Sequence, residues 1–216
     1  MSERLPELMR QRLAAPLPGR PAQARYAPQL SFGRHFGPPF TGARDAAVAL
    51  LLFRPRGAGE EWAVPLTLRP LELTHHGGQV SLPGGGIDAG ETIEQAALRE
   101  LSEEIGVHAN QVQTLGRLTP LYLYNSHYQV NPCVVVTERP VDFQLNPGEV
   151  EELIEIPLGE LTSIGRQESE PPQCTLCRRG VEFNAPVIPH DQHRIWGATA
   201  MILGEFTSLL ADIYPG

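Results

Sequence analysis

The segment that follows residue 81 joins a run of glycines to an acidic helix, and this combination constrains the fold most strongly. The loop Leu82-Pro83-Gly84-Gly85-Gly86 leads to Thr92, which has Gln95 three positions later, the spacing of an N-terminal capping box. Gly106 stands where such a helix is expected to end. Apolar side chains recur every four residues between these limits, at Ile93, Ala97, Leu101 and Ile105. The sequence therefore predicts an amphipathic helix over residues 93–105.

This helix carries three carboxylates at spacings of three and four residues, namely Glu100, Glu103 and Glu104. Residues at these spacings lie side by side on a helix, so the three side chains project within an arc of roughly 100°. Like charges this close repel each other unless a cation lies between them, and Mg²⁺ commonly binds proteins through a few carboxylates. The carboxylates adjoin the apolar stripe, so we expect them at the edge of the buried face, over a cleft. A solvated acidic surface is the alternative interpretation.

The spacing of the charged residues matches a family signature. Gly85 is followed after five residues by Glu91, and after seven more by the run Arg99-Glu100-Leu101-Ser102-Glu103-Glu104-Ile105-Gly106-Val107. This segment resembles the signature of the Nudix hydrolases at every fixed position. The resemblance implies an α/β fold, a Nudix-type α/β/α sandwich with a mixed β-sheet. It also implies a Mg²⁺- or Mn²⁺-dependent enzyme that hydrolyses a nucleoside diphosphate linked to a further moiety.

The same resemblance implies roles for residues within the segment. The three helix glutamates would bind the metal and carry catalysis, and Gly85 would contribute backbone contacts to metal or phosphate. Glu91 and Arg99 would form a structural ion pair that joins the loop to the helix. The reaction also needs a base near the attacking water. The sequence leaves several candidates for this base, which are Glu103, Glu149, Glu151 and Glu152.

A stretch just before this segment is similar to a motif of the coenzyme A pyrophosphatases. It begins at Leu66-Thr67-Leu68-Arg69 and keeps further positions of that motif at Gly78, Pro83, Gly84 and Gly85. The similarity implies that coenzyme A is cleaved to 3′,5′-ADP and 4′-phosphopantetheine, with Arg69, Gly84 and Gly85 in contact with the substrate. A guanidinium makes bidentate contacts to phosphate, which supports Arg69 in this role. An arginine that packs its stem at a strand end is the plain alternative.

The stretch also departs from the motif, at Pro70, Thr74 and Leu82. Thr74 replaces an expected arginine, and the neighbouring His75 and His76 could take its place only as hydrogen-bond donors. Two other functions therefore stay open. One is a Nudix pyrophosphatase that acts on ADP-ribose, a dinucleotide or a nucleotide sugar, and the other is a non-catalytic module that binds nucleotides. The intact set of glutamates favours an enzyme over a binding module.

Composition divides the chain into two parts. Residues 1–44 are rich in proline and glycine and lack an apolar period beyond a short predicted helix at residues 6–15, so we expect an extended arm that wraps the domain or a dimer partner. Residues 45–216 are expected to form the catalytic domain, because strand and helix patterns alternate there. A homodimer is one interpretation of the arm.

Several segments of the second part read as strands, namely residues 46–54, 62–69, 78–82, 111–124, 129–137, 153–156 and 182–188. Residues 157–161 are expected to begin a turn or helix. An apolar period over residues 196–213 predicts a closing helix. Because both long helices have an apolar stripe to bury, we expect them on opposite sides of the sheet.

Charge and cysteine content limit the kinds of partner and the cellular setting that we expect for this chain. The formal net charge of −8 argues against a nucleic-acid partner, but not against a small phosphate ester held through a metal. No apolar run is long enough to span a membrane, and an odd number of cysteines favours a reducing, cytoplasmic setting. Cys174, Cys177, His190 and His193 approach a zinc-finger spacing, but the histidines are too close together and prolines interrupt the segment. We therefore expect a surface loop there, without zinc.

Overall fold

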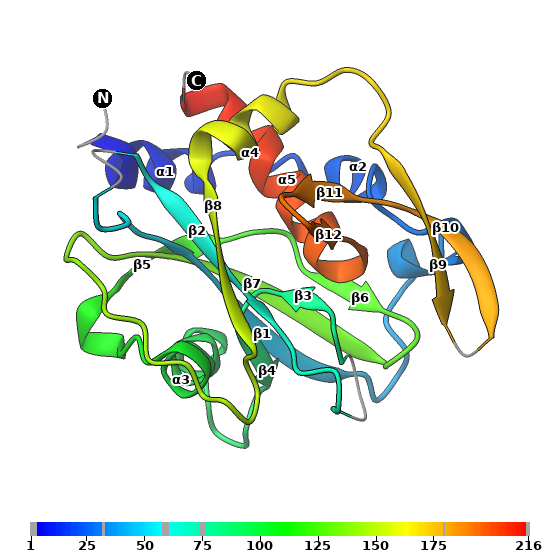
Figure 1. Cartoon of the computed structure of the whole chain (residues 1–216), viewed down its shortest axis with the longest axis horizontal. Helices are drawn as coiled ribbons and strands as arrows, with labels where there is room; N and C mark the ends of the chain where they lie inside the picture. Colours follow the sequence, from blue (N-terminus) through cyan, green and yellow to red (C-terminus); the bar gives the residue numbers. More distant parts are fainter. Residues whose placement is uncertain (1–3, 32, 58–60, 74–76, 179, 215–216) are drawn as a thin grey trace.

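A computed structural model describes residues 4–31, 33–57, 61–73, 77–178 and 180–214 (Figure 1). Thr74, His75 and His76, which bear on the substrate motif, lie outside these residues. Among the described residues, no helix combines the length and the apolar character that crossing a bilayer requires.

The central sheet is mixed. Its strands are β1 (Arg44–Leu52), β4 (Gly84–Gly86), β5 (Gln113–Arg117), β6 (Leu121–Leu123) and β7 (Tyr128–Val136). Strand β1 lies between β4, to which it is antiparallel, and β7, to which it is parallel over its whole length. Strands β5 and β6 both pair antiparallel with β7, so the strand expected over residues 111–124 is present but interrupted near Pro120. The predicted α/β class and mixed sheet are confirmed.

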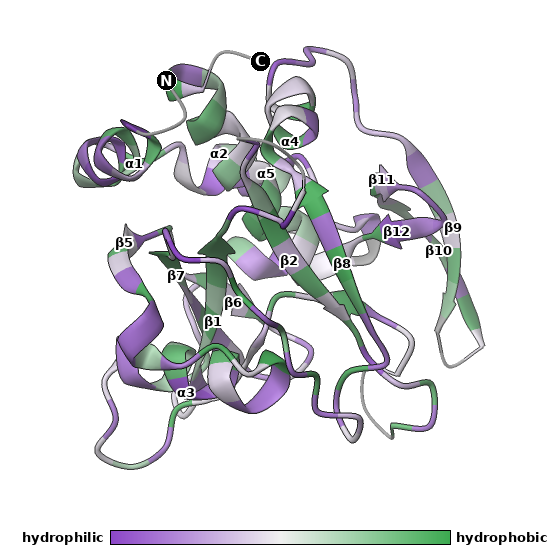
Figure 2. Cartoon of the chain, turned by 60° about the vertical axis from the view of Figure 1, so that its left-hand side comes forward, coloured by the Kyte–Doolittle hydropathy of each residue, from purple (hydrophilic) through white to green (hydrophobic). Residues whose placement is uncertain are grey.

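Helices cover both faces of this sheet (Figure 1). Helix α3 (Ile93–Ile105) packs on the face formed by the odd-numbered residues of β1, through Ala97, Leu101 and Ile105. Helix α5 (Gly197–Ile213) packs on the other face, where the even-numbered residues of β1 meet a larger apolar cluster. Because strand side chains alternate between faces, the apolar run of β1, green in Figure 2, supplies both layers of the core. The expected placement of the two long helices on opposite sides is confirmed.

A second, smaller antiparallel sheet adjoins the first. It contains β2 (Ala63–Leu68), which lies between β3 (Val80–Ser81) and β8 (Glu152–Pro157). Strand β8 leads directly into helix α4 (Leu158–Gly165), which confirms the helix expected to begin near residue 157. Figure 2 shows hydrophilic and hydrophobic residues alternating along β8, as in a strand with one buried face.

The N-terminal segment begins with the predicted short helix, and further short helical elements follow it where the composition predicts extended chain. Helices α1 (Leu5–Ala14) and α2 (Gly19–Ala24) are followed by short 3₁₀ turns at Gln29–Ser31 and Arg34–Phe36. Leu5, Met9 and Tyr26 are buried in the same cluster as α5. The apolar contacts of this segment are therefore tertiary, which explains why no local periodicity reveals the second helix.

The segment around Cys174 and Cys177, expected to be a surface loop, forms strand β9 (Gln173–Arg178). It pairs in a hairpin with β10 (Val181–Pro186), which confirms the strand predicted over residues 182–188. Cys174 and Cys177 are three positions apart in β9, so their side chains point to opposite faces. A second hairpin, β11 (Ile188–His190) and β12 (His193–Ile195), places His190 Nδ1 3.0 Å from Glu160 and His193 Nε2 3.2 Å from Glu152. The four residues with zinc-finger spacing therefore do not converge.

Candidate functional site

Local signals fix both ends of α3. Thr92 and Gln95 form the predicted capping box, in which each side chain accepts a hydrogen bond from the backbone N–H of the other residue. Gly106 ends the helix with φ of 74°, a left-handed conformation that glycine adopts without a steric penalty. These two signals set the rotation of the helix, and with it the direction in which its carboxylates project.

Glu104 joins the helix to both sheets. Its side chain is 1% exposed, with Oε1 accepting a hydrogen bond from the Gly84 N–H at 3.0 Å and Oε2 accepting one from the Thr67 hydroxyl at 3.2 Å. Burial raises the pKa of Glu104 to about 7, although the Gly84 hydrogen bond and the charge of Arg69 act in the opposite direction. The Gly84 N–H is thus already engaged by the protein. Thr67 belongs to the motif at residues 66–69, but the sequence did not predict its hydrogen bond to Glu104, because that contact depends on how the two sheets meet.

Glu100 lies against the glycine loop. It is 9% exposed, and a Cβ added at Gly85 would overlap its carboxylate. Burial raises the pKa of Glu100, and a hydrogen bond from Arg99 opposes that effect. The absence of a side chain at position 85 therefore lets this carboxylate lie directly against the loop backbone.

Arg99 organises the charges of the site with all of its N–H donors. Nε and Nη2 donate to the two carboxylate oxygens of Glu91 at 2.8 and 3.0 Å, in a bidentate pair that joins loop to helix. Nη1 donates to Glu100 at 2.7 Å and Glu103 at 3.1 Å, and Nη2 also donates to the Gly86 carbonyl at 2.9 Å. One guanidinium thus holds three carboxylates around the glycine loop.

The donor set suits a hard divalent cation. Within the described residues, no three Asp, Glu, His or Cys side chains are arranged to hold a metal, because Glu100 and Glu103 face Arg99 while Glu104 faces Gly84 and Thr67. However, Arg99 supplies a single positive charge against the carboxylates that it contacts, and Glu104 adds a further buried one. Oxygen ligands with excess negative charge beside a close-lying backbone match the preferences of Mg²⁺ and Mn²⁺.

Two other residues proposed from the sequence lie near this cluster. Arg69 follows β2, where its backbone N–H and carbonyl form hydrogen bonds with Gln79 and Gly78, and its charge acts on Glu104. Among the described residues, its guanidinium forms neither a hydrogen bond nor an ion pair. The charge of Glu149 raises the pKa of both Glu100 and Glu104, which places it close to them.

The other two candidates for the base, Glu151 and Glu152, have different surroundings. Glu151 is exposed, and its backbone N–H pairs with the Leu68 carbonyl. Glu152 lies in β8 and is engaged by His193, which the sequence did not single out as a partner. Of the three candidate bases in this run, Glu149 is therefore the one whose charge acts on the cluster.

The glycines of the loop allow a stability test. A Cβ at Gly84 would lie 2.5 Å from Val48 Cγ1 and 2.6 Å from the Ala47 carbonyl oxygen, whereas a Cβ at Gly86 would meet no atom within 4 Å. Strand β1 is paired with β4 and β7, so its backbone cannot shift to make room for the added methyl group. We therefore expect Gly84→Ala to lower the free energy of unfolding by about 1–3 kcal/mol or more. The matched control Gly86→Ala should stay within about 0.5 kcal/mol of wild type in denaturant titrations. Equal effects of the two substitutions would contradict this packing.

Comparison with known proteins agrees with this geometry. The model of the NUDIX domain family matches residues 43–174. An uncharacterized Nudix hydrolase, NudL, of Photorhabdus laumondii is 37% identical over 164 residues, which cover 75% of this chain and 82% of that protein. NudL of Yersinia pestis is 35% identical over 164 residues, covering 76% and 77%. The crystal structure of a Nudix hydrolase from M. smegmatis, RenU, is similar over 64% of this chain and 81% of that chain, with 25% sequence identity and a TM-score of 0.47.

The family match covers more than half of the chain and includes the glycine loop, α3 and the central sheet. The chain therefore belongs to the Nudix family and is a Nudix diphosphatase, an enzyme that hydrolyses pyrophosphate bonds in a family that generally uses divalent metal ions.

Proposed function

We propose that this enzyme hydrolyses the diphosphate of coenzyme A or a derivative, giving 3′,5′-ADP and 4′-phosphopantetheine. The observation that carries the proposal is Arg69. Its charge acts on Glu104 at the site, and its guanidinium forms no hydrogen bond or ion pair with any described residue. Coenzyme A carries a 3′-phosphate besides its diphosphate, and an arginine without an ion pair to any described carboxylate suits such a group. The similarity of the stretch from Leu66 to Gly85 to the coenzyme A pyrophosphatase motif supports the same substrate.

In this proposal, Glu100, Glu103 and Glu104, with the backbone of Gly85, hold Mg²⁺ or Mn²⁺. When bound, the ion supplies positive charge that offsets the negative charge developing on the diphosphate oxygens. Arg99 and Glu91 keep the loop and the helix in register, and Glu149 takes the proton from the attacking water. The single N–H of Gly84 is bonded to Glu104, so we assign substrate contacts to Arg69 and Gly85 ahead of Gly84.

A panel of substrates tests the proposal. The protein is incubated with Mg²⁺ or Mn²⁺ and, separately, with coenzyme A, ADP-ribose, a dinucleotide and a nucleotide sugar, and the products are identified by mass. We expect coenzyme A to be cleaved with the highest kcat/KM, and EDTA to stop the reaction until the metal is restored. Preferential cleavage of another diphosphate would identify that compound, and not coenzyme A, as the substrate. Activity that survives thorough chelation would refute the metal site.

Arg69→Ala measures the contribution of the guanidinium. A charge-assisted hydrogen bond contributes roughly 1.5–3 kcal/mol, so we expect kcat/KM for coenzyme A to fall about 10- to 150-fold. Comparing coenzyme A with its 3′-dephospho form on wild type and variant locates the contact. If Arg69 binds the 3′-phosphate, wild type prefers coenzyme A and the variant loses that preference. If Arg69 binds the diphosphate, the substitution lowers kcat/KM by the same factor for both substrates. An unchanged kcat/KM in the variant would exclude any contact between Arg69 and the substrate.

A further inference from the structure

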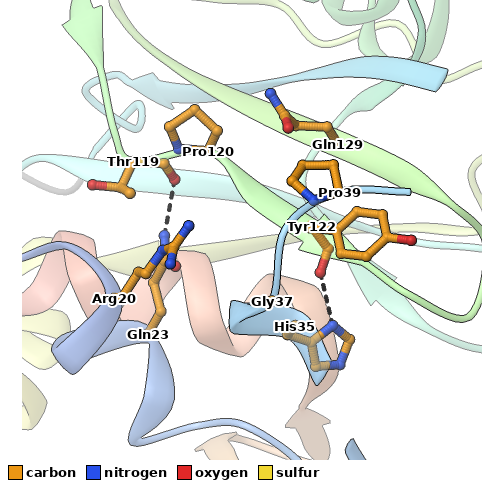
Figure 3. A pocket seen from close by; sticks show the side chains of 9 residues that line it. All are labelled: Arg20, Gln23, His35, Gly37, Pro39, Thr119, Pro120, Tyr122 and Gln129. Carbon is orange, nitrogen blue, oxygen red and sulfur yellow. Dashed lines mark hydrogen bonds between the residues drawn. The ribbon is translucent and has the colours of Figure 1, made fainter. Parts of the chain in front are cut away.

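A cavity of about 260 Å³ lies between the N-terminal segment and the edge of the central sheet, and no residue of the carboxylate cluster lines it (Figure 3). Arg20 and Gln23 come from α2, His35 from the second 3₁₀ turn, and Thr119 and Tyr122 from the region of β6. None of the residues that line it is acidic. The cavity is slightly below the roughly 300–1,000 Å³ typical of sites for drug-sized ligands, so it suits a small metabolite.

A buried carboxylate fixes one wall of this cavity. Glu205 of α5 is 0% exposed and accepts hydrogen bonds from the Gly19 N–H, the Gln23 amide and the Thr119 hydroxyl at 3.1, 2.9 and 2.7 Å. The Gln23 amide also donates to the Thr119 carbonyl at 2.8 Å (Figure 3). Burying a charge costs free energy unless hydrogen bonds compensate, and here several neutral donors do so. The positions of Gln23 and Thr119 are thereby set before any ligand arrives.

Three lining groups retain unused hydrogen-bonding capacity. Gln23 is fully buried, and its Oε1 has no donor among the described residues. His35 Nδ1 lies 2.8 Å from the Tyr122 carbonyl, and burial lowers the pKa of this histidine, so the neutral ring leaves Nε2 as an acceptor. Arg20 donates from Nη1 to the Phe36 carbonyl at 3.0 Å and forms no ion pair with any described carboxylate. One buried acceptor, one histidine ring nitrogen and one arginine without an ion-pair partner among the described residues therefore line the same cavity.

We propose that this cavity binds a small oxyacid anion that also carries a hydrogen-bond donor. Its anionic oxygens pair with the Arg20 guanidinium, whose planar fork matches carboxylate and phosphate oxygens. An amino group donates to both Gln23 Oε1 and His35 Nε2, and a hydroxyl donates to one of them; a donor to Gln23 Oε1 satisfies a buried acceptor that otherwise costs free energy. Hydrogen phosphate, hydroxy acids and amino acids share this chemistry. The site is independent of the proposed diphosphate hydrolysis, because none of its residues belongs to the carboxylate cluster.

Calorimetric titration of the full chain in EDTA tests the site with three probes, inorganic phosphate, L-lactate and L-alanine, against a background of constant chloride. We expect saturable binding of at least one probe with one site per chain, and the probe that binds identifies the source of the anion. Arg20→Gln should weaken binding by about tenfold or more. Arg166→Gln is the matched control, because Arg166 is also exposed and donates to a single backbone carbonyl, that of Tyr214. It should leave the affinity within twofold of wild type.

Glu103→Gln separates this cavity from the hydrolytic site and should also leave the affinity unchanged. The proposal is overturned if no probe saturates, or if Arg20→Gln binds within twofold of wild type. It is also overturned if Glu103→Gln abolishes binding, since the anion then occupies the hydrolytic site. Circular dichroism of each variant checks that the N-terminal segment remains folded.

Discussion

Glu103→Gln should reduce turnover by roughly a thousandfold or more while leaving the protein folded. The substitution removes one negative charge from the proposed metal site, and a metal that polarises phosphoryl oxygens contributes several kcal/mol to transition-state stabilisation. Glu103 suits this test better than Glu104, because its side chain is 51% exposed and Arg99 is its one hydrogen-bond and ion-pair partner among the described residues. A surface ion pair of this kind contributes about 0–1 kcal/mol, so the unfolding midpoint should hardly move.

The matched control is Glu94→Gln, on the first turn of the same helix. Glu94 pairs with Arg117 and, among the described residues, forms no hydrogen bond or ion pair with the glycine loop, so its loss should leave kcat within about threefold of wild type. Mn²⁺ titration followed by electron paramagnetic resonance adds a readout apart from activity, and Glu103→Gln should weaken Mn²⁺ binding while Glu94→Gln should not. Wild-type activity of Glu103→Gln, or a loss explained by unfolding in calorimetry, would contradict the proposed metal site.

The helix at the centre of the site could be predicted to the residue, because all of its signals are local. A capping box at Thr92 and a left-handed glycine at position 106 determine its ends, and a period of four determines its buried stripe. The side-by-side arrangement of the three glutamates follows from helix geometry alone. The sequence also suggested the pairing of Glu91 with Arg99, which the structure shows as a bidentate contact.

Features that depend on tertiary contacts could not be predicted in the same way. Helix α2 has six residues and is held by Glu205 from the far end of the chain, so no local pattern could reveal it. Strand β9, where we expected a loop, pairs with β10 over its whole length, and the sequence did not indicate this pairing. The hydrogen bond from Arg99 to the Gly86 carbonyl could not be predicted either, because it forms only where the loop folds back over the helix.

The position of Glu149 also depends on tertiary contacts, and it leads to a second test with a large effect. The loop before Glu149 is fastened to the end of α3, where the N–H groups of Gln144 and Asn146 donate to the carbonyls of Ile105 and Glu104 at 3.0 and 2.9 Å. These bonds satisfy helix carbonyls that would otherwise lack partners. They also hold Glu149 beside the cluster, where its charge raises the pKa of Glu100 and Glu104.

If Glu149 accepts the proton of the attacking water, Glu149→Gln should lower kcat by about 10²- to 10⁴-fold, the usual contribution of a general base. The amide keeps the shape of the side chain and can still accept the 3.4 Å hydrogen bond from Asn146, so the loop should remain in place. Mn²⁺ affinity should therefore stay close to wild type, which distinguishes a base from a metal ligand. Glu151→Gln is the matched control, because Glu151 is exposed two positions later, and it should retain kcat within about threefold. Equal losses in the two variants, or wild-type kcat in Glu149→Gln, would assign the base elsewhere and leave Glu103 as the candidate.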